Sequence, residues 1–87
     1  MNEELITKVA SIIEQWNPLG SAANTTDNLD GYRYEAIDII ATIQLSGSLD
    51  NVKKSIEQVL TQAFNIELNK AKLTKASKDI EALLNTN

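Results

Sequence analysis

The side chains that most often carry enzyme chemistry are missing from this chain of 87 residues, which contains no histidine and no cysteine. Histidine is the commonest general base and metal ligand, and it assists the usual serine and cysteine hydrolases. Cysteine is required for disulfides and thiolate metal sites. Carboxylate, lysine and tyrosine side chains are what remain for chemistry. We therefore expect no enzyme activity, no catalytic residue, no cofactor and no metal site.

The segment from Asp27 to Gly31 is the part of the sequence most similar to a calcium-binding loop. If Gly31 is the glycine at position six of such a loop, position one falls on Thr26 and position twelve on Ile37. Calcium loops need a carboxylate at both of these positions, so the pattern fails. Aspartate and asparagine are also typical of helix caps and turns, and that is the interpretation we favour.

Glu35 and Asp38 stand three residues apart, so on a helix they share one face, which points away from the neighbouring isoleucines. A carboxylate pair that does acid–base work needs a cleft that raises one of the two pKa values. An exposed pair lacks that environment and serves solubility. We expect exposure here. An enzyme that uses carboxylates alone is the least favoured alternative, and it requires a deep pocket around at least two acids.

Aromatic and charged residues stand on both sides of a polar segment, with Trp16 before it and Tyr32, Arg33 and Tyr34 after it. These residue types are enriched at binding hot spots. They also have structural roles, as an anchor at the core edge or as ordinary residues of a helix start. Tyr32 and Tyr34 lie about 200° apart on a helix, so at least one must face outward. The predicted partner-binding residues, with two aspartates as an acidic rim, are Trp16, Asp27, Asp30, Tyr32, Arg33 and Tyr34.

Charge is unevenly distributed along the chain. Residues 1–50 contain two basic residues against eight acidic ones, whereas residues 51–87 contain six lysines against four acids. The acidic half disfavours nucleic acid as a partner; it indicates either ordinary solvated faces or a surface that attracts a basic partner. The one lysine cluster has no interleaved aromatic residue for base stacking and indicates a solvated face. Its members are Lys70, Lys72, Lys75 and Lys78.

The elements that position these residues are helices, because apolar residues recur at spacings of three and four. We predict one all-α domain over residues 1–87, a compact and mostly antiparallel bundle. The second helix has the broadest apolar face and should lie centrally. A long polar loop, 19–30, separates it from the first helix. The four helices are expected at about 2–16, 30–45, 49–64 and 69–84.

Several residues are expected to begin or end these helices. Asn17 and Pro18 stop the first helix, because proline restrains the residue before it and has no N–H to donate. Asn65 should end the third, since asparagine tolerates the left-handed conformation. Polar residues and one glycine should form the remaining junctions. These are Asn28 or Asp30 before the second helix, Gly47 after it, and Ser48 or Asp50 before the third.

The composition indicates a small globular domain outside the membrane. The hydrophobic fraction is 43%, ordinary for a folded chain, and no stretch approaches the roughly 20 apolar residues of a membrane span. The acidic start, Met1 to Glu4, does not resemble a signal peptide, so a cytoplasmic location is expected. A domain this small is marginally stable, which keeps self-association open as an alternative.

Three helix junctions carry short motifs, which are Trp16-Asn17-Pro18-Leu19-Gly20, Gly31-Tyr32-Arg33-Tyr34-Glu35-Ala36 with Ile37 and Ile40, and Phe64-Asn65-Ile66 after Ile56 and Val59. With these motifs the sequence resembles the YugE-like family of small bacterial helical proteins of unknown function, over roughly residues 4–84. It departs from the family pattern at Asn17, where aspartate is expected, and in a longer polar loop over residues 21–28. The resemblance implies a compact helical bundle and supplies no catalytic residue.

These observations favour a non-catalytic module that binds another protein of unknown identity. An immunity- or antitoxin-like inhibitor, which is small, acidic, helical and free of cysteine, is one form that such a module takes. The alternative is a structural bundle that forms a homodimer through the broad face of its second helix. Neither nucleic acid nor a membrane is expected as a partner.

Overall fold

The computed structural model describes residues 2–25, 29–46 and 51–85, and they form the all-α bundle that the apolar periodicity predicts. No β-strand occurs in these three segments. The four α-helices are α1 (Glu3–Trp16), α2 (Arg33–Ser46), α3 (Val52–Phe64) and α4 (Lys70–Asn85). Two short 3-10 helices, η1 (Gly20–Thr25) and η2 (Asp30–Tyr32), stand between α1 and α2.

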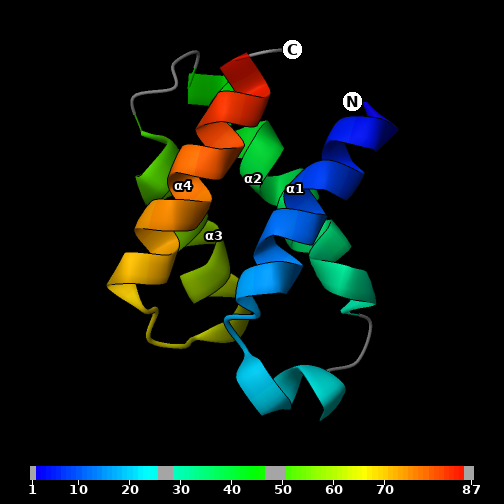
Figure 1. Cartoon of the computed structure of the whole chain (residues 1–87), viewed down its shortest axis with the longest axis vertical. Coiled ribbons are helices and arrows are strands. Elements are labelled where there is room, and N and C mark those ends of the chain that lie inside the picture. The colour runs from blue at the N-terminus through cyan, green and yellow to red at the C-terminus, as the bar shows by residue number, and fades with distance from the viewer. Residues whose placement is uncertain (1, 26–28, 47–50, 86–87) are drawn as a thin grey trace.

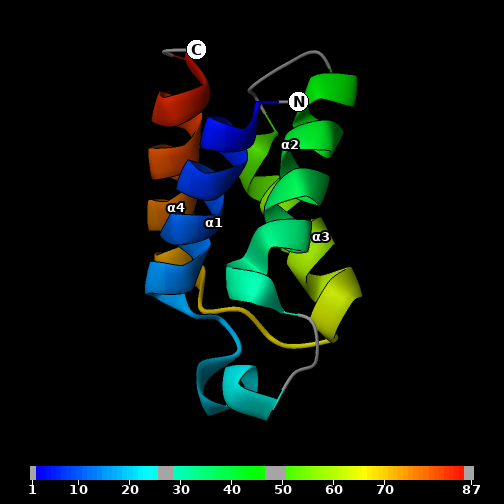
Figure 2. The same ribbon diagram turned by 90° about the vertical axis from the view of Figure 1, so that its right-hand side faces the viewer.

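The helices run alternately down and up, and each packs against its two neighbours in a ring of order α1, α2, α3, α4 (Figures 1 and 2). One end of the bundle holds the first turn of α1 and the last turn of α4. The opposite end holds η1, η2 and the α3–α4 connection, residues 65–69 (Figure 2).

The core is aliphatic, as the small number of aromatic residues requires. Each helix contributes an isoleucine with no exposed surface, and burying such a side chain stabilises the fold by about 1.5–3 kcal/mol. These four residues are Ile13, Ile40, Ile56 and Ile80. One aromatic residue, Tyr32, is also fully enclosed. Ala36 and Ala76 are buried as well.

Asparagine stands at both ends of α1 and at the end of α3. The side chain of Asn2 accepts hydrogen bonds from the backbone N–H groups of Glu4 (2.8 Å) and Leu5 (3.3 Å), which caps α1. Asn17 ends α1 with φ 51°, and its N–H donates to the Ile13 carbonyl. Asn65 ends α3 in the same way, also with φ 51°. The predicted stops at these two positions are confirmed, because asparagine occupies the left-handed region with little strain.

The predicted start of the second helix was wrong. Helix α2 begins at Arg33 and not at residue 30, because Gly31 and Tyr32 both have φ 64° and interrupt the right-handed helix before it. The side chain of Asp30, one of the two proposed caps, is outside what the structure describes, as is the other, Asn28.

Two further differences concern the connections. The segment 19–30 was expected to be an irregular loop, but Gly20–Thr25 forms the 3-10 helix η1. Helix α3 begins at Val52 and not at residue 49, and Asn51 before it makes no side-chain capping bond. The proposed junction residues Gly47, Ser48 and Asp50 lie outside the described residues.

Candidate functional site

Tyr32 is enclosed at the end of the bundle where the α1–α2 connection lies. Its hydroxyl donates to Oδ1 of Asn17 (2.6 Å) and accepts from the backbone N–H of Leu19 (3.3 Å). Its ring stands edge-on to Phe64, with centroids 6.0 Å apart and planes at 88°. With 1% of its surface exposed, Tyr32 is not available to a partner. The structure therefore corrects the predicted role of Tyr32 from partner binding to buried structural contacts.

The surroundings of the Tyr32 hydroxyl disfavour its ionised form. Burial is the main cause that raises the pKa of Tyr32 above its ordinary value, and the N–H of Leu19 lowers it in part. The negative charges of Glu35 and Glu14 raise this pKa further. The hydroxyl therefore stays protonated and continues to donate to Asn17.

Glu35 is half-buried, which corrects the expectation of an exposed carboxylate pair. Its Oε1 atom is enclosed and has no hydrogen-bond partner among the described residues. Desolvation raises the pKa of Glu35; its own backbone N–H lowers the pKa in part, and the nearby charge of Asp38 raises it. Asp38 itself is exposed, as predicted. The two carboxylates thus differ in environment but line no common cleft among the grooves described below.

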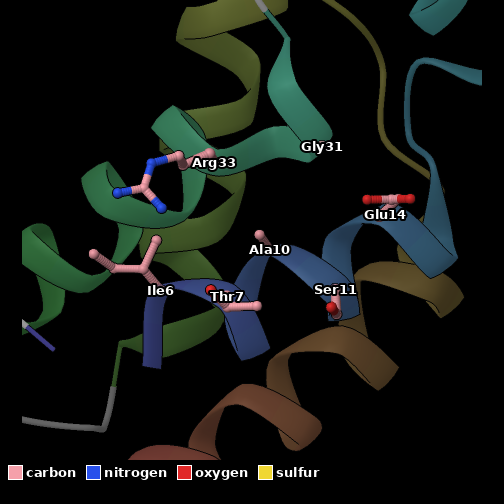
Figure 3. A pocket seen from close by; sticks show the side chains of 7 residues that line it. All are labelled: Ile6, Thr7, Ala10, Ser11, Glu14, Gly31 and Arg33. Carbon is pink, nitrogen blue, oxygen red and sulfur yellow. The ribbon is translucent and has the colours of Figure 1, made fainter. Parts of the chain in front are cut away.

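The groove between α1 and α2 is shallow and open, with a volume of about 350 Å³. Figure 3 shows Arg33 near one end and Glu14 near the other, with the hydroxyl residues Thr7 and Ser11 along α1. Arg33 is engaged here by both carboxylate oxygens of Glu3, one of them at 2.8 Å. The hydroxyl of Thr7 donates to its own helix at the Glu3 carbonyl (3.0 Å). The polar groups at the Arg33 end of this groove are therefore already partnered.

The groove between α1 and α4 contains Trp16, which is half-buried. One part of Trp16 packs against the core and another lines this groove of about 230 Å³ beside Lys72 and Lys75. The structure thus gives Trp16 the role of a core-edge anchor and leaves part of its surface accessible.

The outer face of α2 carries the two large apolar side chains that remain exposed among the described residues. They are Tyr34, 56% exposed, and Leu45, 89% exposed. Asp38 and Ala41 lie between them at helical spacing, so the four residues form one line along the helix. We name Tyr34, Asp38, Ala41 and Leu45 the α2 stripe.

The α2 stripe borders a groove of about 370 Å³ between α2 and α3. On the α2 side the groove is lined by three stripe residues and Thr42. On the α3 side it is lined by Val59, Gln62 and Ala63. The stripe and this groove together form one surface on which Tyr34 and Leu45 remain exposed, and contiguous apolar surface is a feature of interaction sites.

The structure does not bring the six predicted partner-binding residues into one site. Trp16 lines the α1–α4 groove, Arg33 the α1–α2 groove, and Tyr34 the outer face of α2, while Tyr32 is internal. Asp27 lies outside the described residues, and only the backbone of Asp30 is described.

Leu45 is the exposed residue that the sequence prediction missed. A helical wheel of residues 33–46 places it on the side opposite Ile39, Ile40 and Ile43. An apolar residue off the main stripe was therefore the signal that could have identified it, because most helices keep their outer face polar.

The described residues contain neither a cluster of metal ligands nor a helix that could span a membrane. In segments 2–25, 29–46 and 51–85 no group of three or more acidic side chains is placed to hold a metal ion. None of the helices in these segments has the length and apolar character needed to cross a bilayer.

No protein-family profile, curated protein or solved structure matches this chain. Membership of the YugE-like family therefore stays a prediction. The three motifs behind it do meet in space, because Tyr32 of the second bonds to Asn17 and Leu19 of the first and packs against Phe64 of the third. Their residues thus share a packing role at one end of the bundle.

Proposed function

We propose that this protein is a non-catalytic module that binds another protein through the α2 stripe and the α2–α3 groove beside it. The observation that carries the proposal is the exposure of Tyr34 and Leu45 on one face of one helix. Leucine and tyrosine in that position add little to the stability of the isolated fold. On binding, each can bury most of its apolar surface, and this burial is favourable by about 25 cal/mol per Å².

The rest of the helix supports this use of the face. Apolar side chains occur all around α2, whereas in α1 they are concentrated on the side that faces the core. A helix with apolar residues on every side is ordinarily covered on every side. The ring of four helices covers only the inner side of α2, so the outer side is free for a partner.

An inhibitor of the immunity or antitoxin kind is one form of this proposal, supported by small size and net negative charge. The proposal includes a cytoplasmic location, since the chain has no cysteine for the disulfides that small secreted domains use. The homodimer is the competing form, supported by the same exposed face.

Site-specific photocrosslinking in native cells tests the proposal. A photoreactive residue in place of Tyr34 or Leu45 should give one discrete crosslinked species. The same residue in place of Glu81, which is exposed on α4, is the matched control and should give none. Equal labelling from the α2 and α4 positions would contradict the proposal. A crosslinked product of twice the chain mass, with concentration-dependent sedimentation, would identify the homodimer in place of a second protein.

A further inference from the structure

The α2 stripe follows one line along the exposed side of α2. Tyr34, Asp38, Ala41 and Leu45 follow one another at intervals of four, three and four residues, so the stripe covers three turns, about 16 Å along the axis. An amphipathic helix that enters an apolar groove carries its anchor residues at such intervals, so a partner helix lying along the stripe can place apolar side chains over its whole length. The adjacent groove supplies Val59 and Ala63 from α3 as a second wall.

Asp38 is the one charged side chain among the residues that line the α2–α3 groove. It has neither an ion pair nor a side-chain hydrogen bond with another described residue; its carbonyl alone accepts from the Thr42 hydroxyl (2.7 Å). The other lining residues are apolar or neutral polar, so no lysine or arginine of the groove offsets this charge. A covering partner would remove water from the carboxylate, and that is unfavourable unless the partner brings a positive charge or donors.

The position of Asp38 within the α2 stripe argues against a symmetric second copy of the chain as the occupant. Asp38 lies near the middle of the stripe, between Tyr34 and Leu45. In a two-fold dimer each surface patch meets itself, so the centre of the stripe would lie near the symmetry axis. The Asp38 carboxylates of the two copies would then approach each other in a dry interface, where like charges repel most strongly.

We infer that the occupant is an amphipathic helix of a partner protein, with a lysine or arginine inside its apolar face, placed opposite Asp38. The inference rests on the proposed function and adds the chemistry of the partner. The partner's apolar residues cover Leu45, Ala41 and Tyr34, and its cation pairs with Asp38. The acidic balance of residues 1–50 attracts such a helix before contact.

Two synthetic helical peptides of identical composition test this inference. Both carry leucines at spacings of four, three and four over about four turns. One has its single lysine within the leucine face, and the other has it on the polar face. Because the peptides have the same net charge, general attraction to the acidic protein is equal for both. Binding is followed by amide chemical shifts of the labelled full-length chain.

The peptide with lysine in its apolar face should shift the amides of Tyr34, Asp38, Leu45 and Ala63 and bind about tenfold more tightly than its isomer, as expected for a partly desolvated charge pair. Asp38→Asn should remove this preference. Glu81→Lys, which makes a larger charge change on α4, should leave it intact.

Equal affinity of the two peptides for the stripe would overturn the inference while the proposed function stands. Shifts confined to the α1–α2 or α1–α4 groove, or no shifts at all, would overturn both. Concentration-dependent sedimentation that Leu45→Lys abolishes would also overturn the inference, in favour of a second copy.

Discussion

The hydroxyl of Tyr32 donates a 2.6 Å hydrogen bond to the side chain of Asn17, fifteen residues earlier in the chain. Asn17 ends α1, and Tyr32 directly precedes α2, so this bond closes the α1–α2 connection. The backbone N–H of Leu19 donates to the same hydroxyl, and Phe64 of α3 supports the ring. One side chain thus joins the ends of three helices.

Tyr32→Phe should lower the free energy of unfolding by about 1 kcal/mol, the net value of a lost hydrogen bond. Tyr32→Ala should lower it by about 3–5 kcal/mol, because it also leaves a cavity beside Phe64. Urea denaturation measures both changes. Tyr34→Phe is the matched control and should have an effect within about 0.5 kcal/mol, since Tyr34 is exposed. Equal effects of the two Tyr→Phe changes would contradict the role of Tyr32.

Gly31→Ala should destabilise the fold by about 1 kcal/mol or more. Gly31 has φ 64°, where an L-residue is strained, and an added Cβ would lie 2.9 Å from Oε2 of Glu14. Gly20 provides the control, because it has φ 59° and open space around the added atom. The difference in unfolding free energy between Gly31→Ala and Gly20→Ala therefore measures the cost of displacing Glu14. If Gly31→Ala were the milder of the two, the close approach of Glu14 would be excluded.

Glu35→Gln should stabilise the protein at pH 7 by about 1 kcal/mol, because it removes the charge of a carboxylate whose Oε1 atom is enclosed without a hydrogen-bond partner among the described residues. The pKa of Glu35 is raised in the folded state, so in the window from 4.5 to that raised pKa the native protein binds more protons than the unfolded chain. The contribution of Glu35 to the free energy of unfolding therefore falls as pH rises through this window.

Denaturation of the parent chain and of Glu35→Gln at pH 4 and pH 7 checks this sign. The advantage of the variant should be larger at pH 7 than at pH 4. Glu81→Gln, at an exposed position on α4, is the control. A variant advantage that grows toward low pH would contradict the desolvation of Glu35.

The ion pair of Glu3 with Arg33 should make stability depend on pH in the opposite direction. The hydrogen bond from Arg33 is the main cause that lowers the pKa of Glu3, so its contribution to stability is present above pH 4.5 and is lost as pH falls through the lowered value. Arg33→Gln should return the Glu3 pKa toward 4.5 in an NMR titration. High salt should reduce the shift in the parent chain, because Glu3 is fully exposed. A Glu3 pKa that Arg33→Gln leaves unchanged would show that the pair does not form in solution.

Leu45→Gln should leave the free energy of unfolding within about 0.5 kcal/mol of the parent, because Leu45 is 89% exposed. Ile40→Ala on the inner side of the same helix should cost about 2–5 kcal/mol. Thermal or urea unfolding separates the two. A large loss of stability in Leu45→Gln would mean that this leucine serves the fold and would remove it from the proposed binding surface.

Most of the helical architecture follows from local sequence. The apolar spacing in residues 5–13 and 73–80 favours a helix whose apolar face is buried. The stops at Asn17 and Asn65 follow from the chemistry of asparagine and, at the first, from the proline after it. Such features depend on neighbours within a few residues, so the sequence predicts them directly.

The candidate site was less predictable, because burial of a single side chain depends on residues far away in the chain. Tyr32 and Tyr34 have the same residue type and nearly the same position, yet only Tyr32 meets Asn17, Leu19 and Phe64. Glu35 looks like a solvated helix residue in sequence, but the packing around it encloses one of its oxygens.

The sequence by itself determined that this chain folds as helices with aliphatic inner faces and that the reactive inventory lacks histidine and cysteine. Only the tertiary structure decided which aromatic residue is internal and which apolar residues stay outside, with Leu45 the clearest case. The physical reason is the range of the interactions. Helix formation and capping act over three or four positions, whereas the exposure of a side chain is fixed only when the other helices have taken their places in the ring.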